Sequence, residues 1–302
     1  MQSLTHSKRH VVVLILGLLT ALSLLFSACG GTSTSTGGGS PTATVKPSIA
    51  APTNLITPGT LTVGSDTTYP PQEFLDTTTN TYTGFDIDLI TAMAARMGLK
   101  PNIVKTDFTT IIDNLVNKRF DVVISAVTIN PDRQKKADFI PYFNAGESLL
   151  VAKGNPMNLK SVADLCGLNV GVQKATVEQD DLTAGSKDCV SKGKKPINLT
   201  ILASQTDVVQ LLINKRVVAT YQDSPVTDYF NKLNPGQFEV GGAVVNAAQE
   251  GIAVRKGDTA MMTPLQAAFN AVKADGTYNK IVQKWGVTSG ALAMIDRRVK
   301  LV

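Results

Sequence analysis

Short runs of apolar, mostly β-branched residues alternate along the chain with segments whose apolar positions recur at helical spacing. The short runs predict strands at 60–65, 102–106, 121–126, 148–153, 168–173, 198–203, 217–221 and 251–255. Segments such as 86–98 and 109–118 place their apolar residues on one side of a helix. This alternation predicts an α/β fold with mostly parallel sheets and helices packed on both faces.

Polar and aromatic residues gather just after several of these predicted strands. The residues in such positions are Asp66, Tyr69, Phe108, Thr128, Arg133, Thr176 and Asp223. In open α/β sheets, ligands bind beyond the carboxyl ends of the strands. Each position is a weak signal alone, but together they predict one binding site.

The segment around Arg133 reads as the start of a helix, with Asn130 as N-cap and Pro131 as the first helical residue. A cation in the first turn opposes the helix dipole, which suggests an anionic partner. A guanidinium matches a carboxylate in bidentate fashion. The alternatives are a salt bridge to Asp132 or Asp138 and simple solvation among neighbouring lysines.

Asp223 follows the predicted strand 217–221 and precedes "DSPVTDYF", which reads as a helix start. Its carboxylate would suit an ammonium group, and the alternative role of N-cap is compatible with this. Arg133 for a carboxylate and Asp223 for an ammonium group together describe an α-amino acid held by charge-assisted hydrogen bonds.

The first 28 residues read as an export signal, with Lys8 and Arg9 before the apolar run 11–25 and small residues before Cys29. The sequence "LLFSAC" resembles a bacterial lipobox, which implies lipid attachment at Cys29. The alternative is an ordinary signal peptide followed by a stray cysteine. Residues 29–57 are rich in Gly, Ser, Thr and Pro and predict a flexible tether.

Removal of this signal changes the charge and the chemistry that the chain can perform. Loss of Lys8 and Arg9 leaves 27 of the 29 basic residues against 24 acidic ones, a net charge of +3 with no dense basic cluster to bind nucleic acid. Both histidines, His6 and His10, are lost with the signal. A Ser-His-Asp triad and every histidine-dependent metal site are thereby excluded.

Cys166 and Cys189 are the cysteines that remain beyond Cys29. Disulfides persist in exported proteins, and no other partner is available to either cysteine. A structural disulfide is therefore expected. Two free buried thiols are the alternative.

From about Pro58 to Gly286 the chain resembles the polar amino acid substrate-binding proteins of ATP-driven importers, which are solute-binding proteins of family 3. The matching segments are "GFDIDLITAMA", "DFTTIIDNL", "DVVISAVTINPDRQKKADFIPYF", "GLNVGVQKATVEQDDL", "ATYQDSPV", "EGIAVRKG" and "DGTYNKIVQKWG". The resemblance implies that Arg133, Thr128 and Thr176 bind the α-carboxylate of the ligand. It also implies that Asp223 holds the amino group, and that Tyr69 and Phe108 enclose the side chain.

Two residues depart from the family pattern. Ala126 stands where the family often has Gly or Ser, although its backbone carbonyl could still accept from the amino group, and Gln173 replaces a residue that is basic in some members.

Asp66 is the best clue to specificity, because a carboxylate beside the ligand side chain favours donors and repels acids. A basic amino acid or glutamine is the expected ligand. The alternative for Asp66 is a local helix cap.

The resemblance implies a two-lobed periplasmic-binding-protein fold of type II, in which two α/β lobes are joined by two crossing strands. Residues 58–143 and 251–302 would form the first lobe, and residues 144–250 the second. Arg133 and Asp66 would then lie on one lobe, with Thr176 and Asp223 on the other. A ligand that contacts both lobes favours the closed state.

The sequence thus predicts a lipid-anchored, monomeric, extracytoplasmic receptor, without cofactor, that delivers an amino acid to the permease and ATPase of an ABC importer. An alternative from another class is an enzyme on the same scaffold, similar to cyclohexadienyl dehydratases, with Asp223 or Asp66 as general acid. A ligand-binding module of a membrane sensor is a further alternative.

Overall fold

The computed structural model describes residues 46–293. The expected export signal, the expected lipidation site at Cys29 and most of the expected tether lie outside these residues. Contacts along the chain separate residues 1–43 from residues 44–302, so that every described residue belongs to the second unit. The fold below is that of this unit.

The secondary structure of the described residues alternates strands and helices. The strands are β1 (Thr60–Ser65), β2 (Thr68–Tyr69), β3 (Glu73–Asp76), β4 (Thr81–Thr83), β5 (Lys100–Lys105), β6 (Val122–Val123), β7 (Ala137–Ala152), β8 (Asn169–Gln173), β9 (Asn198–Leu202), β10 (Ala219–Asp223) and β11 (Phe238–Arg255). The α-helices are α1 (Phe85–Arg96), α2 (Ile111–Val116), α3 (Pro131–Lys136), α4 (Val177–Ser191), α5 (Gln205–Ile213), α6 (Ser224–Leu233), α7 (Thr259–Ala274) and α8 (Thr277–Trp285). Short 3₁₀ helices cover Phe108–Thr110, Val162–Leu165 and Thr288–Gly290. None of the helices between residues 46 and 293 has the length and apolar character needed to cross a bilayer.

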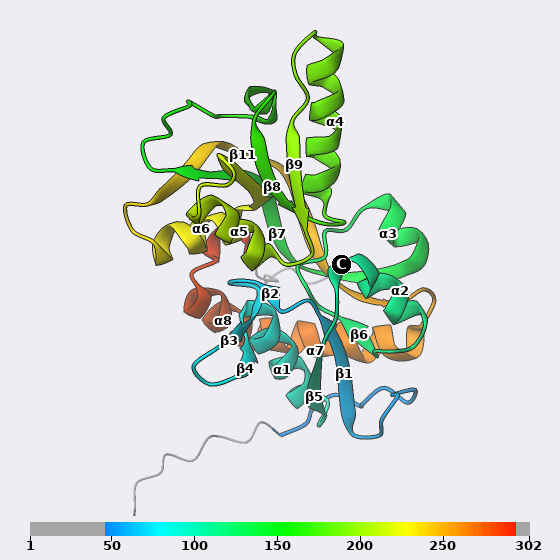
Figure 1. Cartoon of the computed structure of the whole chain (residues 1–302). Helices are drawn as coiled ribbons and strands as arrows, with labels where there is room; N and C mark the ends of the chain where they lie inside the picture. The colour runs from blue at the N-terminus through cyan, green and yellow to red at the C-terminus, as the bar shows by residue number, and fades with distance from the viewer. Residues whose placement is uncertain (1–45, 294–302) are drawn as a thin grey trace, which may run out of the picture. The chain divides into compact units, whose positions relative to one another are not determined.

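One large sheet runs through the unit in the order β5-β1-β6-β11-β7-β10-β8-β9 (Figure 1). Strand β1 pairs in parallel with β5 and β6, and β8 pairs in parallel with β9 and β10. The long strands β7 and β11 pair with each other in antiparallel fashion and belong to both halves of the sheet. The predicted parallel pairing is therefore correct for the outer strands, whereas the two shared strands are antiparallel to their neighbours.

Each half of the sheet has its own hydrophobic core, and this confirms the expected two-lobed fold. The core of the first lobe joins β1, β6, α1, α7 and α8 through residues such as Leu61, Phe85 and Phe269. The core of the second lobe joins β8, β10 and α4 through residues such as Val172, Leu182 and Tyr221. In Figure 1 the two groups of elements lie at the two ends of the unit, with β7 and β11 between them.

Helix α1 begins inside the "GFDIDL" motif, with Gly84 as its N-cap and Phe85 as its first residue. Gly84 has a φ of 135°, and a side chain there would collide with the backbone of Gln72. Asp86 and Asp88 lie in the first turn, and Arg96 lies in the last, so the charges complement the helix dipole. The motif therefore fixes both the start of the helix and its approach to the strands.

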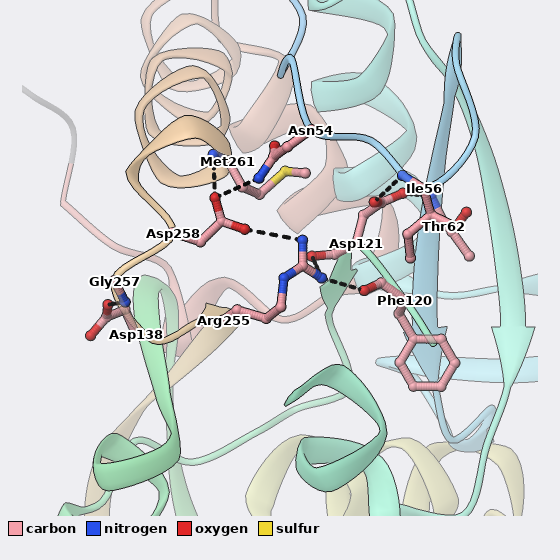
Figure 2. Close-up of polar contacts among 10 residues, drawn as sticks. All are labelled: Asn54, Ile56, Thr62, Phe120, Asp121, Asp138, Arg255, Gly257, Asp258 and Met261. Carbon is pink, nitrogen blue, oxygen red and sulfur yellow. Dashed lines mark hydrogen bonds and ion pairs between the residues drawn. The ribbon is translucent and has the colours of Figure 1, made fainter. Parts of the chain in front are cut away.

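Residues 46–57, the described part of the expected tether, contact the first lobe. The side chain of Asn54 donates to Asp258 Oδ1 at 2.8 Å, and the backbone N–H of Ile56 donates to Asp121 Oδ1 at 2.9 Å. Figure 2 shows both contacts beside the ion pair of Arg255 with Asp258. The final segment before β1 is thus fixed to the first lobe by specific hydrogen bonds.

Cys166 and Cys189 form a disulfide, as the sequence predicts, with their Cα atoms 5.6 Å apart. Cys166 follows the short helix Val162–Leu165, and Cys189 lies in the last turns of α4. The bond therefore ties α4 to the loop before β8. It is located at the opposite end of α4 from Thr176.

Candidate functional site

Arg133 is positioned by the short helix α3. Asn130 caps this helix, because its Oδ1 accepts from the backbone N–H of Arg133 at 2.9 Å. The guanidinium donates to the carbonyl oxygen of Thr128 at 2.8 Å and to that of Ala175 at 3.2 Å. It also lies over the ring of Phe108, with 5.3 Å between Cζ and the ring centroid.

The two acids that the sequence offered as salt-bridge partners of Arg133 are bound elsewhere. Asp132 pairs with Lys135 and Asp138 pairs with Lys256, each at 2.6 Å. No ion pair of Arg133 is found within residues 46–293, and its contacts there are carbonyl groups and an aromatic ring. The guanidinium is therefore available to an anion from outside the chain.

Asp223 ends β10 at the N-terminus of α6, but its side chain does not cap the helix. The hydroxyl of Tyr69 donates to Asp223 Oδ2 at 2.9 Å and accepts from the backbone N–H of Asp223 at 3.1 Å. Asp223 belongs to the second lobe, and Tyr69 follows β1 of the first. The two predicted binding residues thus join the lobes directly.

Asp66 makes the second contact of this kind between the lobes. Its Oδ2 accepts from the hydroxyl of Thr68 at 2.6 Å and from Nε2 of Gln173 at 2.8 Å. A short strand, β2, follows Asp66 in place of a helix, so the alternative role of helix cap does not apply. Gln173 is the last residue of β8, which was predicted as a parallel strand of the second lobe. Its side chain therefore contacts the first lobe from the end of that strand.

The N-terminus of α4 forms another part of the site. Thr176 is the N-cap, with Oγ1 accepting from the backbone N–H of Gln179 at 3.2 Å. Glu178 lies in the first turn with only 2% of its surface exposed, and its Oε1 has no hydrogen-bond partner in the described structure. A buried carboxylate oxygen without a partner is unusual, because buried polar atoms are normally hydrogen-bonded.

These elements line a small cavity between the lobes. Its lining residues are Asp66, Tyr69, Glu73, Phe108, Ser125, Ala126, Thr128, Arg133, Gln173, Thr176, Val177, Glu178 and Asp223. Every ligand-binding residue predicted from the sequence is in this lining. Arg133 and Phe108 also line an adjoining open groove, so they lie at the mouth of the cavity.

Glu73, Ser125 and Glu178 also line the cavity, although they were not among the residues predicted from the sequence. Ser125 donates to Glu73 Oε1 at 2.7 Å and accepts from the backbone N–H of Asp66 at 3.0 Å. Ser125 could have been found from its position near the end of the predicted strand 121–126, directly before Ala126. Glu178 gave no signal of its own, because an acid in a first helical turn is already explained by the helix dipole.

Burial dominates the electrostatics of the cavity. It raises the pKa of Asp66, although the hydrogen bonds from Thr68 and Gln173 act against the change. It also raises the pKa of Asp223 well above its usual value, with the charge of Glu250 adding to the effect. A cation bound beside these buried acids would lower their pKa values, because a nearby positive charge favours the ionised form.

Burial likewise lowers the pKa of the Arg133 guanidinium, and the charges of Glu178 and Asp223 act against the change. An anion beside the guanidinium would stabilise its charged form further. The cavity therefore combines a guanidinium that lacks a carboxylate partner with several acids that lack cations. This set of groups suits a zwitterion.

Comparison with known proteins assigns the chain to a family. Residues 61–288 match the model of the bacterial extracellular solute-binding proteins, family 3. The chain belongs to this family. Arginine-binding protein ArgT of Corynebacterium glutamicum is 32% identical to this family 3 protein over 244 residues, which cover 80% of this chain and 79% of ArgT.

Another sequence relative and a solved structure are also amino-acid-binding proteins by name. The L-cystine-binding protein TcyA of Bacillus subtilis is 29% identical over 228 residues, covering 75% of this chain and 81% of TcyA. The structure of an ancestral arginine-binding protein bound to arginine has a TM-score of 0.70 and 36% identity, covering 75% of this chain and 98% of the other. Named relatives are binding proteins, and this family 3 protein is accordingly an extracytoplasmic binding protein and not an enzyme.

Proposed function

We propose that this protein captures a basic amino acid or glutamine between its two lobes and presents it to the permease of an ABC importer. Arg133, with Thr128 and Thr176, binds the α-carboxylate, and Asp223 binds the α-ammonium group. Tyr69 and Phe108 enclose the ligand side chain, the backbone of Ala126 contributes an acceptor, and Asp66 and Gln173 meet the end of the side chain. Relatives named for arginine, cystine and histidine binding support an amino acid as ligand.

The observation that carries this proposal is the state of Arg133. The guanidinium opens into a cavity between the lobes, has carbonyl partners, and has no acid partner in the described part of the chain. A ligand carboxylate would complete its bidentate geometry. The same cavity holds the buried carboxylate of Asp223, which would complete the pairing of a zwitterion.

The substitution Arg133→Ala tests the proposal. Leaving one member of a buried charge pair without its partner costs about 3 to 5 kcal/mol, so binding should weaken by two to three orders of magnitude or more. Isothermal titration calorimetry with arginine, lysine, histidine and glutamine measures the change. Arg119→Ala, at an exposed position outside the cavity, is the control and should keep wild-type affinity. A loss below about fivefold in a folded Arg133→Ala protein would reject the assignment.

We further propose how the protein is attached to the membrane and divided into lobes. Cys29 carries the lipid anchor, and the tether from there to residue 57 ends on the first lobe. The first lobe comprises residues 58–143 and 251–302, the second comprises residues 144–250, and the protein acts as a monomer. Mass spectrometry of the membrane-extracted protein should find a diacylglyceryl group on an N-terminal Cys29. An unmodified N-terminus, or one at another residue, would contradict the anchor.

A further inference from the structure

Glu73 and Asp86 are two fully buried acids that lie against each other in the first lobe. Glu73 begins β3 and lines the cavity, and Asp86 lies in the first turn of α1. The backbone N–H of Asp86 donates to the carbonyl oxygen of Gln72 at 2.8 Å, which holds the start of α1 beside Glu73. The two carboxyl groups are within hydrogen-bonding reach of each other, and they are called the acid pair below.

The donors around the acid pair satisfy only two of its four oxygens. Ser125 donates its hydroxyl to Glu73 Oε1 at 2.7 Å. The backbone N–H of Ala126 and the hydroxyl of Tyr142 donate to Asp86 Oδ2 at 3.0 and 2.8 Å. Glu73 Oε2 and Asp86 Oδ1 are buried and have no partner within residues 46–293. One oxygen of each acid is therefore left without a donor.

No cation compensates the acid pair, since neither acid belongs to an ion pair of the described chain. The titratable groups that face the pair or line the cavity beside it are Asp66, Tyr142, Glu178, Asp223, Glu250 and Arg133. Most of these groups are acids, and the guanidinium is held at the mouth of the cavity by carbonyl oxygens. Two buried carboxylates in such surroundings cannot both be ionised, because burial disfavours charge and like charges repel each other.

A single proton between the two free oxygens resolves the shortage of donors and the excess of charge together. One carboxyl group then donates to the other, and hydrogen bonds of this O–H···O⁻ kind are short and strong. The acid pair keeps one negative charge in place of two. Burial raises the pKa of both acids, and the charge of Asp86 raises that of Glu73 further, which agrees with a proton retained near neutral pH.

We propose that Glu73 and Asp86 share one proton in the ligand-free protein, and that binding of a cationic amino acid in the cavity drives this proton into the solvent. The release of the proton rests on the proposed function, whereas the shared proton depends on the described chain alone. A positive charge beside Glu73 favours the ionised form, so the ligand and the proton compete. Affinity for the ligand therefore rises with pH, because the complex holds fewer protons than the free protein.

Amide variants test the shared proton without any ligand. In Asp86→Asn the side-chain carbonyl still accepts from Ala126 and Tyr142, while the side-chain N–H replaces the shared O–H and donates to Glu73. Glu73→Gln makes the same replacement from the other side. Each single variant should melt within about 3 °C of the wild-type protein at pH 7. The double variant Glu73→Gln/Asp86→Asn turns two amide donors against each other and should melt at least about 5 °C lower.

Asp121 provides a matched control, because it is a fully buried aspartate of the same lobe in which both oxygens already have donors. Its Oδ1 accepts from the backbone N–H of Ile56 at 2.9 Å and its Oδ2 from that of Thr62 at 2.8 Å (Figure 2). An amide at this position turns a donor against a backbone N–H, so Asp121→Asn should melt at least about 5 °C lower. Equal losses for Asp86→Asn and Asp121→Asn, or a double variant as stable as the single variants, would overturn the shared proton. An Asp86→Asn protein that does not fold would overturn it as well.

Calorimetric titration with arginine in buffers of different ionisation enthalpy counts the protons that leave on binding. The wild-type protein should release more protons than Asp86→Asn, and its affinity should rise from pH 6 to pH 8 by at most about tenfold per pH unit. Asp188→Asn removes an exposed acid that is paired with Lys192 in the last turns of α4, and it should keep the wild-type release.

Each outcome of the titration has a distinct meaning. A smaller release in Asp86→Asn, with the wild-type release in Asp188→Asn, supports the inference. Equal release by the wild-type protein and Asp86→Asn overturns it, and so does a wild-type affinity that is constant from pH 6 to pH 8. Failure of the wild-type protein to bind any amino acid would reject the proposed function and the coupling together, while the melting temperatures still decide the shared proton.

Discussion

Ala126 shows how one residue connects the backbone to the cavity. Its φ is 46°, in the left-handed region that favours glycine, and its backbone N–H donates to Asp86 Oδ2 at 3.0 Å. Strand β6 ends earlier, after Val123, although the apolar sequence predicted a strand as far as Ala126. Glycine, one of the two residues that the resemblance implies at this position, adopts this conformation without a steric cost.

Replacement of Ala126 by glycine should therefore be tolerated. The left-handed conformation costs an L-residue about 1 to 2 kcal/mol, and glycine avoids that cost but loses about 0.5 to 1 kcal/mol through its greater freedom when unfolded. Urea unfolding should show Ala126→Gly to be between neutral and about 1.5 kcal/mol more stable. Ala253→Gly, at a buried strand position without positive φ, should be less stable by about 1 kcal/mol. A loss above 1 kcal/mol for Ala126→Gly would contradict this account.

At the scale of elements, the sequence was informative wherever a side-chain pattern determines the structure. β1 at 60–65 and the capped start of α3 at Asn130 were predicted from alternation and from N-cap chemistry. The full lengths of β7 and β11 were not, because segments such as 242–248 are small, polar or exposed. The two strands stabilise each other by backbone hydrogen bonds, which leave no periodic trace in the sequence.

The disulfide between Cys166 and Cys189 should stabilise the second lobe without tuning the cavity. It closes a loop with a sequence separation of 23 residues. Constraint of the unfolded chain by a loop of this size contributes about 3 kcal/mol. The double variant Cys166→Ala/Cys189→Ala should lose about that much unfolding free energy. Its affinity for amino acids should stay near the wild-type value, because the bond lies at the far end of α4.

Reducing agent provides the control for this prediction. Dithiothreitol should destabilise the wild-type protein to the level of the double variant and leave the double variant unchanged. Equal unfolding free energies for the oxidised and reduced wild-type protein would show that the bond contributes nothing.

The whole molecule contains a set of buried acids behind the cavity. Burial raises the pKa of Asp86 to about 7. It also raises the pKa of Glu73 well above its usual value, with the charge of Asp86 adding to the shift. Burial also raises the pKa of Glu250 well above its usual value. It raises the pKa of Glu147, near the junction of the lobes, to about 7. The folded protein therefore binds more protons than the unfolded chain in the range from pH 4 to pH 7.

Stability should consequently fall as the pH rises. When the folded state holds more protons, the free energy of unfolding decreases with pH until the raised pKa is passed. Because the pKa of Asp86 is raised from 3.8 to about 7, its share of this loss falls between about pH 4 and pH 7. Denaturant unfolding of the ligand-free protein should thus give a higher stability at pH 5 than at pH 8.

Two variants isolate the cause of this pH dependence. Asp86→Asn removes the titrating group and should reduce the slope. Asp132→Asn removes an exposed acid whose pKa is lowered by Lys135, and it should leave the slope between pH 5 and pH 8 unchanged. A wild-type stability that is flat or rises over this range would rule out the buried acids as its determinant.

The pairing of β7 with β11 has a mechanical consequence for the junction between the lobes. Its register shifts between Gly241 and Val245, between Val245 and Ala248, and again between Glu250 and Gly251. Gly242 and Asn246 have positive φ values of 77° and 51° within this stretch. The regular hydrogen bonding between β7 and β11 is therefore interrupted at these positions. If one lobe rotates relative to the other, small dihedral changes there would break few hydrogen bonds. We therefore expect the junction to twist at little cost, so that the contacts across the cavity, rather than the backbone of β7 and β11, determine the angle between the lobes.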